Sequence, residues 1–170
     1  MRKVALFAAL LFLTLVNTGS LKGEVKMRLS SPDFKDQMSM PRKLSCDAEG
    51  NNPALIIEDI PAEAKSLALI ADDPDAPGGT FVHWVVFDIP LTGRIEPGSV
   101  PGRQGVNSTG GNDYVSPCPP SGTHRYFFKV YALDTLLGLD EGITKGALEK
   151  AMQGHILDQA EIVGLYQRGR

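Results

Sequence analysis

The segment Asp72-Asp73-Pro74-Asp75-Ala76-Pro77 joins two apolar runs and decides how the chain folds. The run before it, residues 66–71, is almost continuously apolar, which is typical of a strand that is buried on both faces. The run after it, residues 81–88, is apolar at odd and even positions and predicts a second, central strand. Because two prolines stiffen the connection, we expect Asp73 and Asp75 to be held at a rigid edge between these strands.

His83 lies inside the second of these runs. Strand alternation places it on the same face as Val85 and Phe87. An imidazole among apolar side chains needs a hydrogen-bond partner, because an unpaired buried polar group costs a few kcal/mol. Asp73 and Asp75 are the partners nearest in sequence, so the pattern predicts a contact between His83 and one of them.

A second histidine, His124, opens the longest apolar run, residues 124–134, and alternation puts Tyr126 on its face. The preceding stretch, residues 89–123, holds 13 glycines and prolines in 35 residues. Loops of that length in compact domains usually carry function or are disordered. The stiff segment 117–120 predicts that the second half is an ordered wall. Carboxylates and imidazoles then meet in one small polar pocket.

The remaining patterns favour a mainly β protein. The chain has 18 glycines and 12 prolines against 22% charged residues, a balance typical of turn-rich sheets. Further strands are predicted at residues 54–58 and 161–166. Thr144 can cap a short helix over residues 145–153, with Gly154 at its end.

The first 20 residues predict a secretory signal peptide. Two basic residues precede residues 4–16, which are apolar except for Thr14, and small and polar residues follow. A membrane-spanning helix needs about 20 apolar residues. We expect cleavage between residues 18 and 23, with an uncleaved anchor as the alternative. The rest, residues 27–170, is then one domain, periplasmic or secreted, with no stable membrane insertion after cleavage.

The charge of the chain argues against nucleic acid as a partner. The formal net charge is −3, and removal of residues 1–20 leaves 15 basic against 20 acidic side chains. A mildly acidic protein without basic clusters is a poor ligand for nucleic acid or for anionic membrane surfaces.

The two cysteines, Cys46 and Cys118, allow two interpretations. In an oxidising compartment an even pair is more often a disulfide, and closing a loop of about 72 residues would stabilise the fold by about 4 kcal/mol. A free Cys118 beside His124 would instead suit nucleophilic catalysis.

Four segments in order, residues 73–77, 83–86, 117–126 and 131–134, resemble the phosphatidylethanolamine-binding protein family in its bacterial and archaeal Raf-kinase-inhibitor-like branch. The resemblance implies a large antiparallel sheet packed with a smaller sheet, and a short helical part near the C-terminus. It also implies an anion pocket for phosphate or a phosphoethanolamine-type head group. The residues carried over to that pocket are Asp73, Asp75, His83, Pro117, Cys118, Pro119, His124 and Tyr126.

One residue departs from the family pattern. Relatives commonly have glycine before Pro-Cys-Pro-Pro, whereas this chain has Ser116. A side chain at Ser116 either narrows the pocket or adds a hydroxyl donor, so it bears on head-group selectivity.

Two carboxylates beside an anion site need an explanation. Either they accept bonds from the histidines, or they accept backbone N–H groups of their own loop, or they face the ammonium end of a head group. Phosphate would then be held by imidazolium, by the Tyr126 hydroxyl and by backbone N–H groups. We therefore expect affinity for phosphate to rise as pH falls through the histidine range.

The function predicted from these residues is binding without catalysis, with no cofactor and no resident metal. Two alternatives stay open: a hydrolase that uses a metal held by the His and Asp residues or Cys118 as nucleophile, and an inhibitor of a protease or kinase acting through residues 89–123. Whether the chain forms a homodimer, and which protein it meets, the sequence leaves open.

Overall fold

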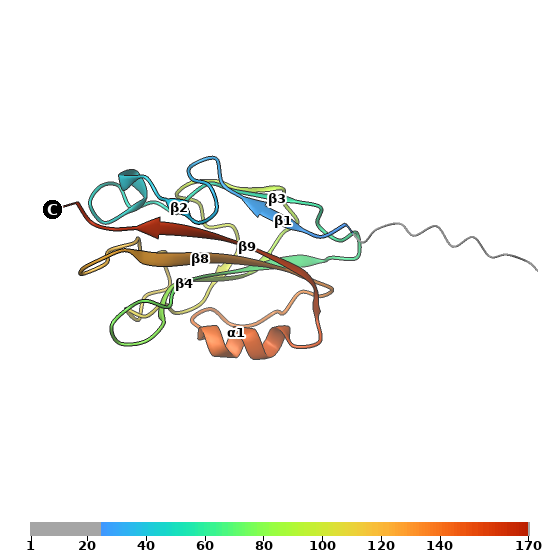
Figure 1. Cartoon of the computed structure of the whole chain (residues 1–170). Coiled ribbons are helices and arrows are strands. Elements are labelled where there is room, and N and C mark those ends of the chain that lie inside the picture. Colours follow the sequence, from blue (N-terminus) through green and yellow to red (C-terminus); the bar gives the residue numbers. More distant parts are fainter. Residues whose placement is uncertain (1–24, 170) are drawn as a thin grey trace, which may run out of the picture.

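The computed structural model of the protein describes residues 25–169, which form two sheets and one α-helix (Figure 1). The large sheet has the strand order β2-β9-β8-β4-β5-β7 and the small sheet the order β1-β3-β6. The elements are β1 (Arg28–Ser30), β2 (Met38–Ser39), the 3-10 helix η1 (Arg42–Leu44), β3 (Leu55–Glu58), β4 (Ser66–Asp73), β5 (Phe81–Ile89), β6 (Arg94–Ile95), β7 (Arg103–Gln104), β8 (His124–Leu133), α1 (Lys145–Met152) and β9 (Ile156–Tyr166).

Strand β4 lies in the middle of the large sheet between β8 and β5, antiparallel to both. All eight of its residues are buried, as the continuous apolar run at 66–71 predicts. The mainly β fold, the two sheets and the short helix near the C-terminus are confirmed. The large sheet is antiparallel except for the two-residue strand β2, which pairs parallel to β9.

The two faces of the large sheet are covered by different elements (Figure 1). The small sheet packs on one face, over a core that includes Leu69, Trp84 and Phe128. Helix α1 packs on the other face, where Leu148 and Met152 lie against Ile70, Val85 and Phe87. Thr144 accepts a hydrogen bond from the Ala147 N–H and caps α1 as predicted.

Several boundaries differ from the sequence prediction. Strand β9 begins at Ile156, five residues before the predicted start, because it pairs with β8 as far as Leu133, the last residue of that strand. Strand β5 is flanked on its outer side only by the two residues of β7, so it is the last long strand of that side and not a central one. The stretch 89–123 contains the short strands β6 and β7.

A β-bulge in β5 corrects the predicted orientation of His83. Ala71 pairs with Trp84 and Asp72 pairs with Val82, so one residue of β5 is extra at this point. A bulge re-aims the side chain at the irregularity. The His83 ring contacts Tyr126 on the small-sheet side, whereas Val85 and Phe87 lie on the α1 side. The prediction that His83 shares their face is therefore wrong.

Cys46 and Cys118 form a disulfide, as one of the two interpretations predicts. Their Cα atoms are 5.4 Å apart, and the Cys46 N–H also donates to the Pro117 carbonyl at 3.0 Å. Both cysteines of the chain are used in this bond.

The predicted signal peptide lies outside the described residues. Within residues 25–169, no helix has both the length and the apolar character needed to cross a bilayer.

Candidate functional site

The site lies where three strands of the large sheet meet at one edge. Because β5 and β8 are antiparallel to β4, the end of β4 at Asp73 lies beside the starts of β5 and β8. A cavity of about 220 Å³ opens there, and the proline-rich loop, residues 115–120, forms one of its walls. Its lining comprises Asp73, Ala76, Pro77, Phe81, His83, Val115, Ser116, Cys118, Pro119, Pro120, His124 and Tyr126.

Asp73 and His124 form a buried pair that lines the cavity. The His124 Nδ1 lies 2.7 Å from the Asp73 Oδ2, and the two side chains are 8% and 5% exposed. The other carboxylate oxygen, Oδ1, accepts the backbone N–H of Asp75 at 2.8 Å. Asp73 therefore accepts both from a histidine and from a backbone N–H of its own loop, which are two of the three arrangements expected for a carboxylate beside an anion site.

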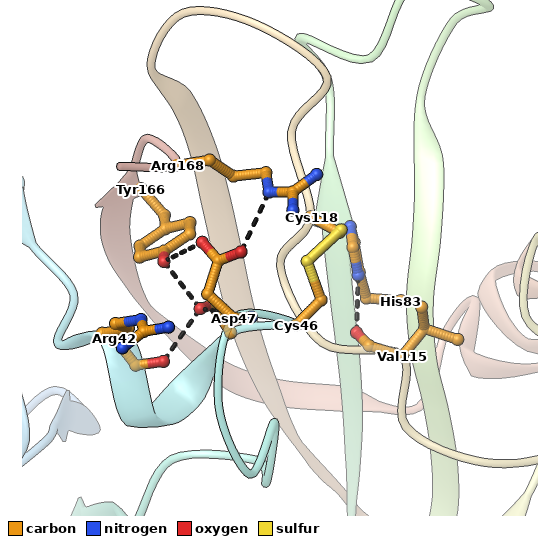
Figure 2. The surroundings of a disulfide bond; sticks show 9 residues. Arg42, Cys46, Asp47, His83, Val115, Cys118, Tyr166 and Arg168 are labelled. Carbon is orange, nitrogen blue, oxygen red and sulfur yellow. Dashed lines mark hydrogen bonds and ion pairs between the residues drawn. A yellow bond between two sulfur atoms is a disulfide. The ribbon is translucent and has the colours of Figure 1, made fainter. Parts of the chain in front are cut away.

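His83 is held by the proline-rich loop and not by a carboxylate. Its Nδ1 lies 2.6 Å from the Val115 carbonyl oxygen, and the Val115 N–H donates back to the His83 carbonyl at 3.0 Å (Figure 2). The predicted partners Asp73 and Asp75 are wrong. Burial lowers the pKa of His83, against the raising effects of the Val115 carbonyl and the Asp73 charge. Its Nε2 is buried without a hydrogen-bond partner among the described residues.

Tyr126 lines the cavity beside His83. Its ring meets the His83 ring edge-on, with centroids 5.2 Å apart. Burial and the neighbouring Asp73 charge raise the pKa of Tyr126. The hydroxyl is therefore protonated at neutral pH and can donate a hydrogen bond to a ligand.

The disulfide fixes the wall of the cavity at Cys118 (Figure 2). Behind Cys46, the Tyr166 hydroxyl bonds to Ser45 at 2.7 Å and to Asp47 at 2.8 Å. Asp47 also accepts from the Arg168 Nε at 3.0 Å. These contacts tie the end of β9 to the segment that holds Cys46, so the wall is anchored from both sides.

Two of the predicted site residues lie outside the cavity lining. The Asp75 carboxylate accepts the backbone N–H of Arg125 at 2.9 Å and its guanidinium at 2.9 and 2.7 Å. This arginine lowers the pKa of Asp75 to about 2. Pro117 is buried behind the wall and uses its carbonyl to accept from Cys46.

Ser116 lines the cavity, and its side chain lies against Gly50. A Cβ at Gly50 would be 2.9 Å from the Ser116 Oγ, and Gly50 has φ +70°, which favours glycine. The space for a side chain at Ser116 therefore depends on the absence of one at Gly50.

Sequence reasoning missed the contributions of Val115 and Phe81. Val115 acts through its backbone carbonyl, which any residue type supplies, so the sequence carries no signal for it. Phe81 contacts the His83 ring with centroids 4.7 Å apart, and its position at the start of the strand was a usable signal.

A larger hollow of about 460 Å³ lies elsewhere, lined by Lys129, Tyr131 and residues 159–161. The lysine that lines this hollow, Lys129, is paired with Asp72, and no histidine lines it. Among residues 25–169, no group of three His, Cys, Asp or Glu side chains is arranged to hold a metal ion.

The fold and cavity define a β-sandwich protein with a small pocket at one sheet edge, in which a few polar side chains lie among apolar ones. The sequence profile described as phosphatidylethanolamine-binding protein matches residues 30–167. A UPF0098 protein of Methanothermobacter thermautotrophicus is 47% identical over 154 residues, covering 84% of this chain and 100% of the relative. A UPF0098 protein of Chlamydia muridarum is 44% identical over 149 residues, covering 84% and 99%.

Two solved structures have the same fold. The Chlamydia trachomatis phosphatidylethanolamine-binding protein homolog CT736 superposes with a TM-score of 0.83 at 40% identity, covering 85% of this chain and 99% of that one. E. coli YbcL, described as a member of the mammalian family, superposes with a TM-score of 0.77 at 26% identity, covering 85% and 100%. The chain belongs to the phosphatidylethanolamine-binding protein family, as the resemblance of its motifs predicts.

Proposed function

We propose that the cavity binds a small phosphate-bearing ligand, either phosphate or a phosphoethanolamine-type head group, and does not turn it over. The observation that carries the proposal is the convergence of His83, His124 and Tyr126 on one cavity. Imidazoles and a phenolic hydroxyl are groups that hydrogen-bond phosphate oxygens.

The size of the cavity supports a small ligand. Pockets for drug-sized molecules measure about 300–1,000 Å³, whereas this cavity measures about 220 Å³. The wall of prolines and the disulfide keep this space in a fixed shape. A head group fits such a volume, while the acyl chains of a lipid would remain outside it.

Binding without catalysis is favoured by the state of Cys118. Its sulfur is bonded to Cys46, so the thiolate that a cysteine-dependent hydrolase needs is absent while the disulfide is intact. We expect no release of inorganic phosphate when the protein is incubated with phosphoethanolamine, with and without added divalent metal. Turnover that exceeds the rate of the buffer blank would contradict this part of the proposal.

Calorimetric titration with sodium phosphate and with phosphoethanolamine tests the binding itself. Tyr126→Phe removes one donor from the cavity and should weaken binding about tenfold, the equivalent of one lost hydrogen bond of about 1.4 kcal/mol. Tyr114→Phe is the matched control, because its hydroxyl is buried without a partner and Tyr114 is absent from the lining. Equal affinity of the two variants, or no binding of either ligand to the wild type, would refute the proposal.

The pH dependence offers a further test. We propose that affinity for phosphate rises as pH falls through the histidine range, since protonation adds positive charge and donors to the cavity. Binding that strengthens from pH 6 to pH 8 would be the contrary result.

We also propose that the protein acts in the periplasm or outside the cell. The apolar leader in the sequence supports this location, and so does a disulfide, which persists in oxidising compartments. Cell fractionation with determination of the mature N-terminus tests it. An N-terminus at Met1 in the cytosolic fraction would count against it.

A further inference from the structure

We propose that this pocket selects a phosphate group that carries a proton, and so distinguishes phosphate and phosphate monoesters from sulfate and phosphodiesters. This inference rests on the proposed function and specifies the ligand class of the same cavity. It follows from the partners of the two imidazoles, which determine which ring nitrogen donates a hydrogen bond and which accepts one.

The proton on His83 is placed by its backbone partner. A carbonyl oxygen can only accept, so the Nδ1 that lies 2.6 Å from the Val115 oxygen carries the hydrogen. A neutral imidazole has one N–H, so the Nε2 has a lone pair and acts as an acceptor. This Nε2 is buried and has no partner among residues 25–169.

His124 has the same arrangement with a different partner. Its Nδ1 lies 2.7 Å from the Asp73 Oδ2, and a carboxylate accepts. The proton of neutral His124 is therefore on Nδ1, which again leaves Nε2 as an acceptor. The two imidazoles that line the cavity thus each have an acceptor at Nε2 when they are neutral.

The charges around the cavity do not favour a bare dianion. The lining contains Asp73 and no lysine or arginine. The Tyr126 hydroxyl is neutral. Just outside, Asp75 is matched by Arg125, and on the other face of the sheet Asp72 is matched by Lys129 and Lys145.

Each Nε2 therefore needs a proton at its contact with the ligand. That proton either arrives on the ligand or is taken up from water by the imidazole. The phosphate monoanion brings two protons and a monoester monoanion brings one. Sulfate and a phosphodiester bring none near neutral pH, so their binding must draw every proton from water.

The difference in proton uptake fixes the expected result. Between pH 6 and pH 8, the ratio of phosphate affinity to sulfate affinity should widen by at least about tenfold per pH unit, because free phosphate keeps at least one proton that sulfate lacks. The measurement is calorimetric titration of the purified protein with sodium phosphate, phosphoethanolamine, sodium sulfate and dimethyl phosphate at pH 6, 7 and 8. Repeating each titration in buffers of different ionisation enthalpy counts the protons taken up.

Asp73→Asn tests the placement of the His124 proton. The Asp75 N–H cannot change its role, so the amide must keep its oxygen at the Oδ1 position and turn its NH₂ toward His124. The His124 Nδ1 then accepts, and its proton moves to Nε2. We expect sulfate affinity to rise at least about tenfold at pH 8 and its pH dependence to lose about one proton.

Asp72→Asn is the matched control. Asp72 is equally buried and adjacent, but it lies on the other face of the sheet and contacts two lysines. The variant makes the same change of charge and should leave the ratio of phosphate to sulfate affinity unchanged. Circular dichroism checks that both variants fold, and the wild-type ratio decides the question if either does not.

The outcomes separate the two proposals. A ratio that widens with pH, together with its decrease in Asp73→Asn alone, supports the selection of a protonated ligand. Sulfate or dimethyl phosphate that binds as tightly as phosphate, at a ratio independent of pH, overturns this selection and leaves the proposed function intact. Absence of binding by all four probes overturns the proposed function and the selection with it.

Discussion

Asp72 and Asp73 are neighbours in β4 with nearly the same burial, 2% and 3% exposed, and they face opposite sides of the large sheet. On the α1 side, Asp72 accepts from Lys129 at 2.9 and 3.1 Å and from Lys145 at 2.6 Å. On the small-sheet side, Asp73 faces His124. One carboxylate is matched by two lysine side chains, and the other by a single imidazole.

The comparison teaches how one strand end serves both stability and binding. Lys145 is the first residue of α1, so the Asp72 network fixes the start of the helix on the sheet. On the other side, His83 Nε2 and the Tyr114 hydroxyl are the buried side-chain atoms without partners in the described part of the chain. Unpaired buried polar atoms reduce stability, and they gather on the side that holds the cavity.

The largest expected effect on stability concerns the disulfide at the wall of the cavity, on the face of the large sheet that holds Asp73. Reduction of the Cys46–Cys118 disulfide should lower the free energy of unfolding by about 4 kcal/mol, because it frees a loop of 72 residues in the unfolded chain. Chemical denaturation with and without reductant measures this loss. Hydrogen exchange should show lost protection around Cys118 and unchanged protection in α1. Equal loss of protection around Cys118 and in α1 would contradict the expected difference between the two faces of the sheet.

The second prediction compares the two carboxylates directly. Asp72→Asn should cost about 3 kcal/mol, because two lysines lose the charge of a buried partner. Asp73→Asn should cost about 1 kcal/mol, because a neutral amide can still bond a neutral His124. Denaturation of both variants at pH 7.5 gives the two values. The reverse order would show that the Asp73 pair is the more important for stability.

The third prediction uses two tyrosines that differ in hydrogen bonding. Tyr114→Phe should raise the free energy of unfolding by about 1 kcal/mol, since it removes an unpaired buried hydroxyl. Tyr166→Phe should lower it by about 1 kcal/mol, because it removes contacts with Ser45 and Asp47. Thermal unfolding of both variants checks the opposite signs. A loss of stability in Tyr114→Phe would mean that its hydroxyl is satisfied.

The smallest expected effect is the pH dependence of the Asp75–Arg125 pair. Arg125 lowers the pKa of folded Asp75 from 3.8 to about 2. A lowered pKa gives stability that is present above pH 3.8 and is lost as pH falls through about 2. Asp75→Asn should therefore cost less than about 1 kcal/mol at pH 6, and the difference from the wild type should vanish near pH 2. Denaturation at pH 6, 4 and 2 measures it, and a difference that persists at pH 2 would contradict the ion pair as its source.

Much of the fold could be predicted from the spacing of apolar residues. The continuous run at 66–71 and the alternation from His124 onward correspond to β4 and β8. The start of β9 could not be found in this way, because Ile156 and Leu157 are both exposed and give no alternation.

The site was predictable only in part. The meeting of Asp73, His83 and His124 followed from strand ends and from the family resemblance. The partner of His83 did not, because it is a backbone carbonyl. The pairing of Asp75 with Arg125, which leaves Asp75 outside the cavity lining, could have been predicted. Arg125 follows His124 directly in the sequence, and a guanidinium pairs readily with a carboxylate.

The bulge in β5 brings the His83 imidazole to the cavity through a single extra residue. Without it, the ladder between β4 and β5 would run without a step, and the imidazole at this position would turn toward the α1 side. Deletion of His83 would remove the extra residue and its imidazole together, so it should weaken binding at the proposed site while the ladder between β4 and β5 continues without a step.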